Sequence, residues 1–476
     1  MNKQEFSRRQ FLRTASLASM AGLSVSPFLL ELNSVAAMAQ DASPTDYRAL
    51  VCIFLQGGND GHGTVIATDP DSFSAFTSAR SGAPGLAYPL SELLPISPKT
   101  PQTGRTFALN PYLTGVQNLF NAGRAALVVN TGTLVAPATK AQIQASSVPL
   151  PASLYSHFDQ TAAWQAIAAN GGSAVHTGWG GAMADLIASM NSNTAFTCIS
   201  TAGVALFLSG MTSYQLNVTS AGPIPIYGLS QPLFGQQAGT DALSSILSAE
   251  ETNLFAKEYG VVINRSIAAQ ASLVSSMLPA GAEGVPNPPQ YLDPMTNTLT
   301  DNGLASSLQT VARIIGGKGG LGVSRQIFYV QLGGFDMHDN QAPQHARLLT
   351  QLGQALEYFD GLMTSAGLGN QVTTFTASDF GRTLTSNSDG TDHGWGSHHI
   401  VVGGAVNGQD MYGQYPVIGS NQANDMGAGR LIPTTSVEQY AGTLARWFGL
   451  SDSQVKEVFP NFVNFGTNPY LGFMSS

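Results

Sequence analysis

The stretch 49-ALVCIFL-55 is a continuous apolar run that passes directly into the glycine-rich loop 56-QGGNDGHG-63. Seven residues without a polar interruption are typical of a strand that is buried on both faces, as in the parallel sheets of α/β proteins. The loop that follows adds polar side chains at the carboxyl end of this strand, where α/β proteins place their sites. The stretch therefore predicts both a fold class and a position for the function.

Other segments repeat this pattern along the chain. Apolar runs of the same kind occur at 125–130, 326–332, 371–376 and 400–404. Helix-like segments at 343–363 and 436–449 lie between or after them. The alternation predicts an α/β fold with a mostly parallel central sheet and helices on both faces.

We expect one domain over residues 46–473. The region of about 205–300 is richer in Gly, Pro, Ser and Asn and has weaker periodicity, so we expect an irregular excursion or a small cap there, with a helix near 244–278.

Composition limits the classes of function. The chain has 476 residues, of which 43% are hydrophobic and only 10% charged, and its net charge is −9. It is long enough to bury a large core, and its acidic balance makes nucleic acid an unsuitable partner.

The N-terminus carries the pattern of a twin-arginine signal peptide. The motif 7-SRRQFLR-13 is followed by the mildly apolar 14-TASLASMAGLSVSPFLL-30 and by the small-x-small site Ala37-Met38-Ala39. Cleavage after residue 39 removes four basic and two acidic residues, so the net charge becomes about −11. We expect the twin-arginine export machinery to deliver the protein to the periplasm or the exterior, without a transmembrane anchor in the mature chain.

The two cysteines leave two possibilities open. Cys52 and Cys198 both lie in apolar, strand-like runs. In an oxidising compartment they can pair, but buried free thiols are about as common in such runs.

Acidic and imidazole side chains follow several of the predicted strands. Asp60 follows the first strand, Asp336 and His338 follow 326–332, and Asp379 follows 371–376. Because the carboxyl ends of parallel strands share one rim, we expect these side chains to lie close together. Carboxylates and imidazoles that converge in this way suit a divalent ion such as Zn²⁺, Mn²⁺ or Mg²⁺.

The stretch 390-GTDHGWGSHH-399 contains three of the eight histidines of the chain. We expect this loop to fold over the rim and to supply His393 and His398 as late metal ligands, with Asp392 orienting a neighbouring imidazole. His399 runs into the strand predicted at 400–404, so we expect it to point away.

Several motifs together resemble a family of exported bacterial proteins. The leader, 57-GGNDG-61, 155-YSHFD-159, 334-GFDMHDNQ-341, 378-SDFGRT-383 and 390-GTDHGWGSHH-399 are similar to domain of unknown function 1501, whose fold is placed in the alkaline phosphatase and sulfatase superfamily. The resemblance covers about residues 46–473.

This resemblance implies a metal-dependent hydrolase of phosphate or sulfate esters. It implies one or two divalent ions at the strand ends and a Ser or Thr nucleophile between them. Ser156 resembles that nucleophile, and Arg382 is implied to hold an oxygen of the ester through its guanidinium group. The metal ligands it implies are Asp60, Asp336, His338 and Asp379, completed by His393 and His398.

Two departures and two alternatives stay open at this stage. Phe380 stands where the superfamily commonly has a histidine, and Asn59 competes with Asp60 as the first ligand. Ser156 is equally suited to cap a helix, with Asp159 three residues on. The chain is therefore either a hydrolase or a non-catalytic envelope binding or assembly protein that keeps the fold.

Overall fold

The computed structural model describes residues 46–166, 177–247, 253–419 and 421–475. The predicted signal peptide, residues 1–39, and His176 lie outside the described residues.

The core of the fold is a mostly parallel sheet with the order β16-β5-β15-β12-β1-β11-β6-β7-β8. β1 is parallel to both β11 and β12, whereas β15 is antiparallel to its neighbours β12 and β5. The predicted α/β class with a mostly parallel sheet is confirmed. The bounds of the strands are β1 Arg48–Gln56, β5 Ala125–Gly132, β6 Cys198–Ser200, β7 Gln215–Thr219, β8 Gly222–Pro223, β11 Arg325–Gly333, β12 Val372–Ser378, β15 Ser397–Val402 and β16 Asp410–Tyr412, with the short β17 Thr435–Ser436 paired to β5.

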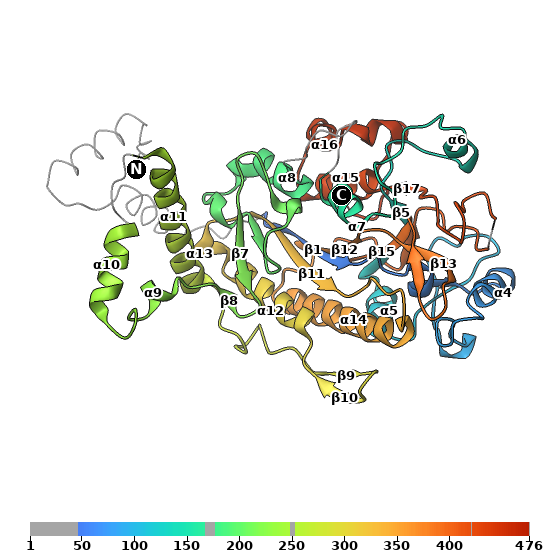
Figure 1. Cartoon of the computed structure of the whole chain (residues 1–476), viewed down its shortest axis with the longest axis horizontal. Coiled ribbons are helices and arrows are strands. Elements are labelled where there is room, and N and C mark those ends of the chain that lie inside the picture. Colours follow the sequence, from blue (N-terminus) through green and yellow to red (C-terminus); the bar gives the residue numbers. More distant parts are fainter. Residues whose placement is uncertain (1–45, 167–176, 248–252, 420, 476) are drawn as a thin grey trace, which may run out of the picture.

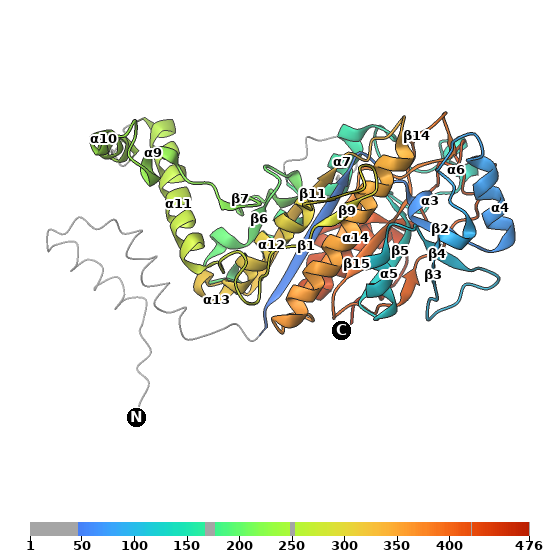
Figure 2. The same cartoon turned by 90° about the horizontal axis from the view of Figure 1, so that it is seen from below.

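Both faces of this sheet are buried under helices. Along β1, Val51 and Ile53 face one hydrophobic core and Cys52 and Phe54 face the other. This alternation follows from the two-residue period of a strand, and it explains why the run has no polar position. One face is covered by α5 Thr114–Asn121, α12 Gly303–Gly316 and α14 Gln341–Ser365, and the other by α8 Trp179–Ile187, α15 Val437–Phe448 and α16 Asp452–Val458 (Figures 1 and 2).

One strand begins earlier than the sequence predicts. The apolar run 400–404 predicted the start, but β15 begins at Ser397, so His398 and His399 lie inside the strand instead of the preceding loop. The pattern missed them because both imidazoles are buried in the sheet among aromatic side chains, where they take the place of apolar residues.

Smaller elements surround the sheet. The described part of the region of about 205–300 contains the strands β7, β8, β9 and β10 and the α-helices α9, α10 and α11, of which α11 is the longest. These helices project from the edge of the sheet beyond β7 (Figure 1). The remaining bounds are α3 Gly61–Thr64, β2 Val65–Ala67, α4 Pro70–Ala79, β3 Leu94–Ile96, β4 Phe107–Leu109, α6 Lys140–Gln144, α7 His157–Gln165, α9 Tyr227–Ser230, α10 Gln237–Leu247, α11 Leu254–Ser276, β9 Tyr291–Asp293, β10 Thr298–Thr300, α13 Lys318–Leu321, β13 Arg382–Ser386 and β14 Thr391–His393.

The two cysteines are free and buried. Cys52 lies on β1 and Cys198 on β6, and β11 runs between these strands. Two strand spacings separate their backbones by about 9.5 Å, beyond the roughly 7 Å that a disulfide spans. Within the described part of the chain, no helix is long and apolar enough to cross a membrane.

Candidate metal centre

The candidate site lies at the rim where β1, β11 and β12 end. Asp336 and His338 follow β11, and Asp379 is the first residue after β12. The hairpin of β13 and β14 returns to the same rim and pairs Arg382 with His393. α7 begins there with His157 at its first position.

Three imidazole rings converge on one carboxylate oxygen. The Nε2 atom of His393 lies 3.1 Å from Nε2 of His157 and 3.0 Å from Nε2 of His338. Oδ1 of Asp336 lies 3.3 Å from the Nε2 atoms of His157 and His393, and 3.1 Å from that of His338. Four ligand-type atoms from three separate segments therefore surround one point.

The other ring nitrogen of each histidine faces an acceptor. Nδ1 of His157 lies 2.7 Å from Oδ2 of Asp379, and Nδ1 of His393 lies 2.7 Å from the carbonyl oxygen of Tyr155. Nδ1 of His338 lies 3.4 Å from Oδ1 of Asp392. Carboxylate and carbonyl oxygens accept hydrogen bonds, so a proton on each Nδ1 atom satisfies these acceptors, and in a neutral ring this tautomer leaves a lone pair on Nε2.

Lone pairs that face one another at 3.0 to 3.1 Å require a cation between them. The cation is either a proton on one ring or a bound metal ion. Histidine ligands usually donate their second N–H to a carboxylate or a carbonyl, as all three histidines do here. The corners of a tetrahedral zinc site lie about 3.3 Å apart, close to the separations observed. The residues present therefore fit a divalent ion.

The best-defined ligand set is His157, Asp336 and His393. Their ligand atoms all lie within 4.8 Å of one another. His338 is the natural fourth ligand because its Nε2 atom adjoins both Asp336 and His393.

Asp336 is held as a carboxylate. Burial alone would raise its pKa, but the hydrogen bond from Arg382 and the neighbouring charges lower the pKa to about 2. Nη1 of Arg382 donates to Oδ1 of Asp336 at 2.9 Å. The ligand oxygen is therefore ionised at any physiological pH.

The two best-placed imidazoles differ in their affinity for a proton. The hydrogen bond to Asp379 raises the pKa of His157, whereas burial lowers the pKa of His393. Two imidazoles whose Nε2 atoms lie this close together hold at most one proton between those atoms. A metal ion that binds there displaces this proton.

Backbone geometry fixes the ligands. Gly57 has a φ of +114°, and a Cβ added to it would meet the backbone nitrogen of Asp336 at 2.3 Å, so only glycine fits between the two strand ends. Tyr155 has a φ of +73°, which aims its carbonyl at His393. Arg430 donates from Nε to the carbonyl oxygen of His393 at 2.8 Å and lies over the Tyr155 ring.

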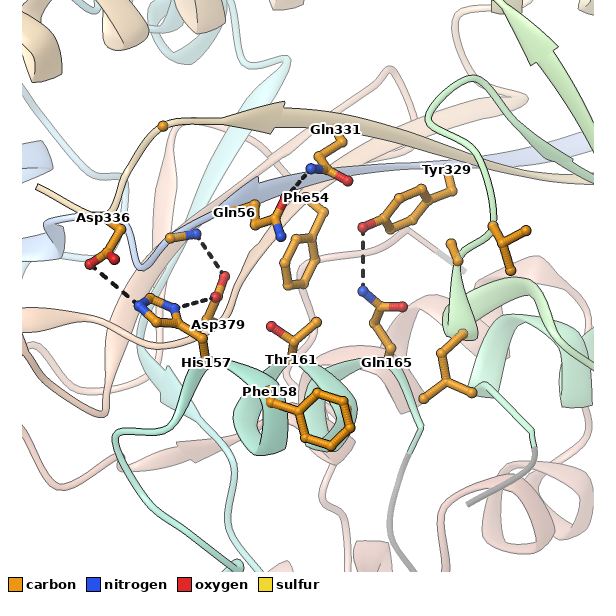
Figure 3. A pocket seen from close by; sticks show the side chains of 16 residues that line it. Phe54, Gln56, His157, Phe158, Thr161, Gln165, Tyr329, Gln331, Asp336 and Asp379 are labelled. Atoms are coloured by element: carbon orange, nitrogen blue, oxygen red, sulfur yellow. Dashed lines mark hydrogen bonds and ion pairs between the residues drawn. The ribbon is translucent and has the colours of Figure 1, made fainter. Parts of the chain in front are cut away.

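An open cleft of about 680 Å³ adjoins the ligands. Figure 3 shows His157 between Asp336 and Asp379 at one end of this cleft, while Thr161 and Phe158 continue along α7. Opposite α7 lie the amides of Gln56 and Gln331 and, farther on, Tyr329. A molecule in the cleft would meet neutral polar and aromatic groups on the way to the ligands. We call this space, which is lined by His157, Thr161 and Asp336 among others, the first cleft.

Asp379 supports a ligand and does not point at the shared space. Its Oδ2 faces Nδ1 of His157, its Oδ1 accepts a hydrogen bond from the backbone nitrogen of Gly57 at 3.0 Å, and its side chain is 1% exposed. It takes the position of a carboxylate that orients a histidine ligand, instead of the direct ligand expected from the sequence.

Asp60 is occupied elsewhere. Its two oxygens accept bonds from both terminal nitrogens of Arg80 at 2.6 and 2.8 Å, and from Gln341 at 2.9 Å. It also caps α3 through Gly63. Asp60 lies at the rim that the sequence predicts for it. The buried guanidinium group of Arg80 neutralises its charge, so Asp60 is not part of the candidate site. Asn59, its competitor, bonds Thr64 and His345.

His398 is also outside the cluster. As a residue of β15 it is buried, its Nδ1 accepts a bond from the backbone nitrogen of Asn130 at 3.0 Å, and its ring stacks on Tyr415. Burial lowers its pKa to about 3. His399 faces the other way and packs against Trp164 and Tyr440. The expected role of His398 as a ligand is therefore replaced by a packing role.

Ser156 has the geometry of a helix cap. It precedes α7, and its hydroxyl lies 2.6 Å from Oδ2 of Asp159 and 3.4 Å from the Asp159 backbone nitrogen. It does not line the first cleft, whereas Thr161 does. Of the two interpretations of Ser156, the geometry favours the cap.

Arg382 is buried and engaged. Besides Asp336, its guanidinium bonds the carbonyl oxygens of Gly57 and Thr391, and its side chain is 1% exposed. It positions Asp336 and does not project toward a substrate.

Phe380 packs against the rings of His157 and His393, with centroids 4.7 Å from each. An apolar ring thus packs against two of the three imidazoles at this rim.

Sequence reasoning missed His157 as a ligand. In the motif 155-YSHFD-159, the serine was interpreted as a possible nucleophile. The histidine after it was not assigned as a ligand, because it does not follow a predicted strand. A histidine at the first position of a helix, in a motif already singled out, was the available signal.

Similar proteins were found at the level of structure and of a family. Among the solved structures, Ps i-CgsB in complex with k-i-k-neocarrahexaose matches with a TM-score of 0.36 and 8% identity, covering 89% of this chain and 78% of that one. The PsFucS1 sulfatase from Pseudoalteromonas sp. matches with a TM-score of 0.35 and 8% identity, covering 89% and 72%. A protein from Bacteroides thetaiotaomicron, described with the metabolism of multiple glycosaminoglycans, matches with a TM-score of 0.34 and 10% identity, covering 87% and 74%. Likeness at this level carries no conclusion on activity.

No curated protein sequence matches this chain. Residues 282–459 match the family described as "Protein of unknown function (DUF1501)", and this match includes Asp336, His338, Asp379 and His393 but not His157.

Proposed function

We propose that this protein is a metal-dependent hydrolase of phosphate or sulfate esters. The observation that carries the proposal is the convergence of three Nε2 atoms on Oδ1 of Asp336 while each Nδ1 faces an acceptor. The ligand set is His157, Asp336 and His393, with His338 as the fourth ligand. The geometry supports one ion, and the nitrogen-rich donors favour Zn²⁺ or Mn²⁺ over Mg²⁺.

The charge of the site favours an anionic substrate. Three carboxylates, Asp336, Asp379 and Asp392, lie at the site together with the guanidinium groups of Arg382 and Arg430. A divalent ion would therefore leave the site with a net positive charge. When bound, such an ion polarises an ester oxygen and makes a water molecule more acidic.

The residues of the chain hold that arrangement in place. Asp379 and the Tyr155 carbonyl fix the tautomers and orientations of two ligands, and Arg382 keeps Asp336 ionised. Thr161 presents a hydroxyl to the first cleft one helical turn after His157. This makes Thr161 a better-placed substrate contact than Ser156.

A direct test combines metal analysis with turnover. Purified protein is assayed with aryl phosphates and aryl sulfates after addition of Zn²⁺, Mn²⁺ or Mg²⁺, alongside Asp336→Ala and the control Asp389→Ala, an exposed carboxylate of the neighbouring loop. We expect turnover that depends on the metal and that only Asp336→Ala abolishes. Bound metal without any turnover would instead identify a non-catalytic envelope binding protein.

We also propose export by the twin-arginine machinery to the periplasm or the exterior. The proposal rests on 7-SRRQFLR-13 and on the site Ala37-Met38-Ala39. Replacing Arg8 and Arg9 by Lys preserves the charge but removes the guanidinium pair. The precursor of the double variant should remain in the cytoplasm, and normal secretion of this variant would contradict the proposal.

A further inference from the structure

A second cleft adjoins the first one. It has a volume of about 680 Å³ and lies between α11, the strand β7 and the segment of residues 193–196. The loop of residues 201–214 separates the two clefts, and Val204 on this loop lines both of them with 81% of its surface exposed. The two clefts therefore adjoin each other at the side chain of Val204.

The lining of the second cleft is almost uncharged. Apolar side chains such as Phe196, Leu216 and Val262 line it together with hydroxyl and amide groups such as those of Thr212, Asn217 and Ser266. Its only charged lining residue is Arg265, whose guanidinium lies 4.2 Å from the centroid of the Tyr214 ring. Among the described residues no carboxylate forms an ion pair with Arg265, so this cation has an aromatic neighbour but no counter-ion there.

We propose that the two clefts together bind a polyhydroxylated chain that carries several sulfate or phosphate groups. Hydroxyl and amide side chains match the alcohols of such a chain, and Arg265 matches one of its anionic groups. This deepens the ester-hydrolase proposal and rests on it, because the group to be cleaved would lie at the metal ligands while a second group lies at Arg265.

The test measures binding, so it does not depend on turnover. Isothermal calorimetry compares three probes: dextran sulfate of about ten glucose units, unsulfated dextran of the same length, and polyglutamate of matched charge. The variants are Arg265→Glu and Tyr214→Ala, with Lys257→Glu as the control. Lys257 lies on the same helix, is exposed, and does not line either cleft.

Dextran sulfate should bind the wild-type protein most tightly. Arg265→Glu should weaken this binding by about tenfold or more, the usual effect of losing a charge-assisted hydrogen bond. Tyr214→Ala should weaken it by a smaller factor, while Lys257→Glu changes it by less than about twofold. An unchanged melting temperature shows that each variant is folded.

Three results would overturn the inference. They are equal effects of Arg265→Glu and Lys257→Glu, tighter binding of polyglutamate than of dextran sulfate, which would indicate an acidic peptide, and no binding of dextran sulfate at all. Binding with the expected variant effects but without ester turnover would refute the hydrolase proposal alone.

Discussion

The Nε2 atoms of His157 and His393 lie 3.1 Å apart although 236 positions separate the two residues in the sequence. One histidine starts a helix and the other ends a strand of a hairpin, so the contact arises only in the folded chain. Two nitrogen lone pairs at this distance are stabilised by a shared cation, and Asp336 supplies the negative charge beside them.

The first prediction concerns metal binding. Zn²⁺ or Mn²⁺ at about 100 times its dissociation constant should stabilise the wild-type protein by roughly 2.7 kcal/mol, which raises the melting temperature by several degrees. His157→Ala and His393→Ala should lose this rise, because each removes a ligand and also leaves an acceptor without its donor. Asp389→Ala should retain the rise. Equal stabilisation of all four proteins by the metal would rule out this ligand set.

The second prediction concerns the carboxylate behind His157. Asp379→Asn keeps the shape but removes the charge that orients the imidazole, so metal affinity should fall by about 10- to 100-fold. Asp392→Asn should reduce the metal affinity by a smaller factor. The Oδ1 atom of Asp392 lies farther from Nδ1 of His338, at 3.4 Å, and both side chains are about half exposed. Competition with a chelator of known affinity measures both. A larger loss in Asp392→Asn than in Asp379→Asn would contradict the assignment of His157 as the principal ligand.

The third prediction concerns Ser156. As a cap of α7, Ser156→Ala should cost about 1 kcal/mol of unfolding free energy and leave turnover intact, whereas Ser156→Thr should recover most of the stability. Urea unfolding and an initial rate on the same samples provide the measurement. Loss of turnover in Ser156→Ala at unchanged stability would restore its interpretation as the nucleophile.

The fourth prediction concerns Glu438, a buried carboxyl on α15 that accepts a bond from Asn461 at 2.8 Å. Burial raises its pKa from 4.5 to about 7. Between these two values the folded protein holds the proton more tightly than the unfolded chain, so the free energy of unfolding decreases as the pH rises through this window, by up to about 3 kcal/mol.

Glu438→Gln should remove that contribution. The difference in unfolding free energy between the variant and the wild-type protein should be small near pH 4.5 and should favour the variant by about 2 to 3 kcal/mol near pH 8. Urea titrations at pH 4.5, 6 and 8 measure it, with the exposed Glu457→Gln as the control. A difference that stays constant across these pH values would show that the pKa of Glu438 is the same in the folded and the unfolded chain.

Local sequence patterns were sufficient for the main elements of the fold. The apolar runs at 49–55 and 326–332 became β1 and β11, because a strand buried on both faces cannot carry polar side chains. The same logic placed Asp336 and Asp379 at one rim, since parallel strands end on the same side of a sheet. The start of β15 was misjudged, because buried imidazoles interrupt the apolar pattern there, and the short strands β7, β8 and β16 were not predicted.

By itself, the sequence determined the α/β class and the rim of the sheet at which polar side chains such as Asp336 and His393 gather. The tertiary structure alone decided which of those side chains share a single space. Arg80 neutralises Asp60, β15 buries His398, and α7 brings His157 to His393. The physical reason is that periodicity encodes burial along a segment, whereas the pairing of a charge or a lone pair depends on which distant segment packs against it.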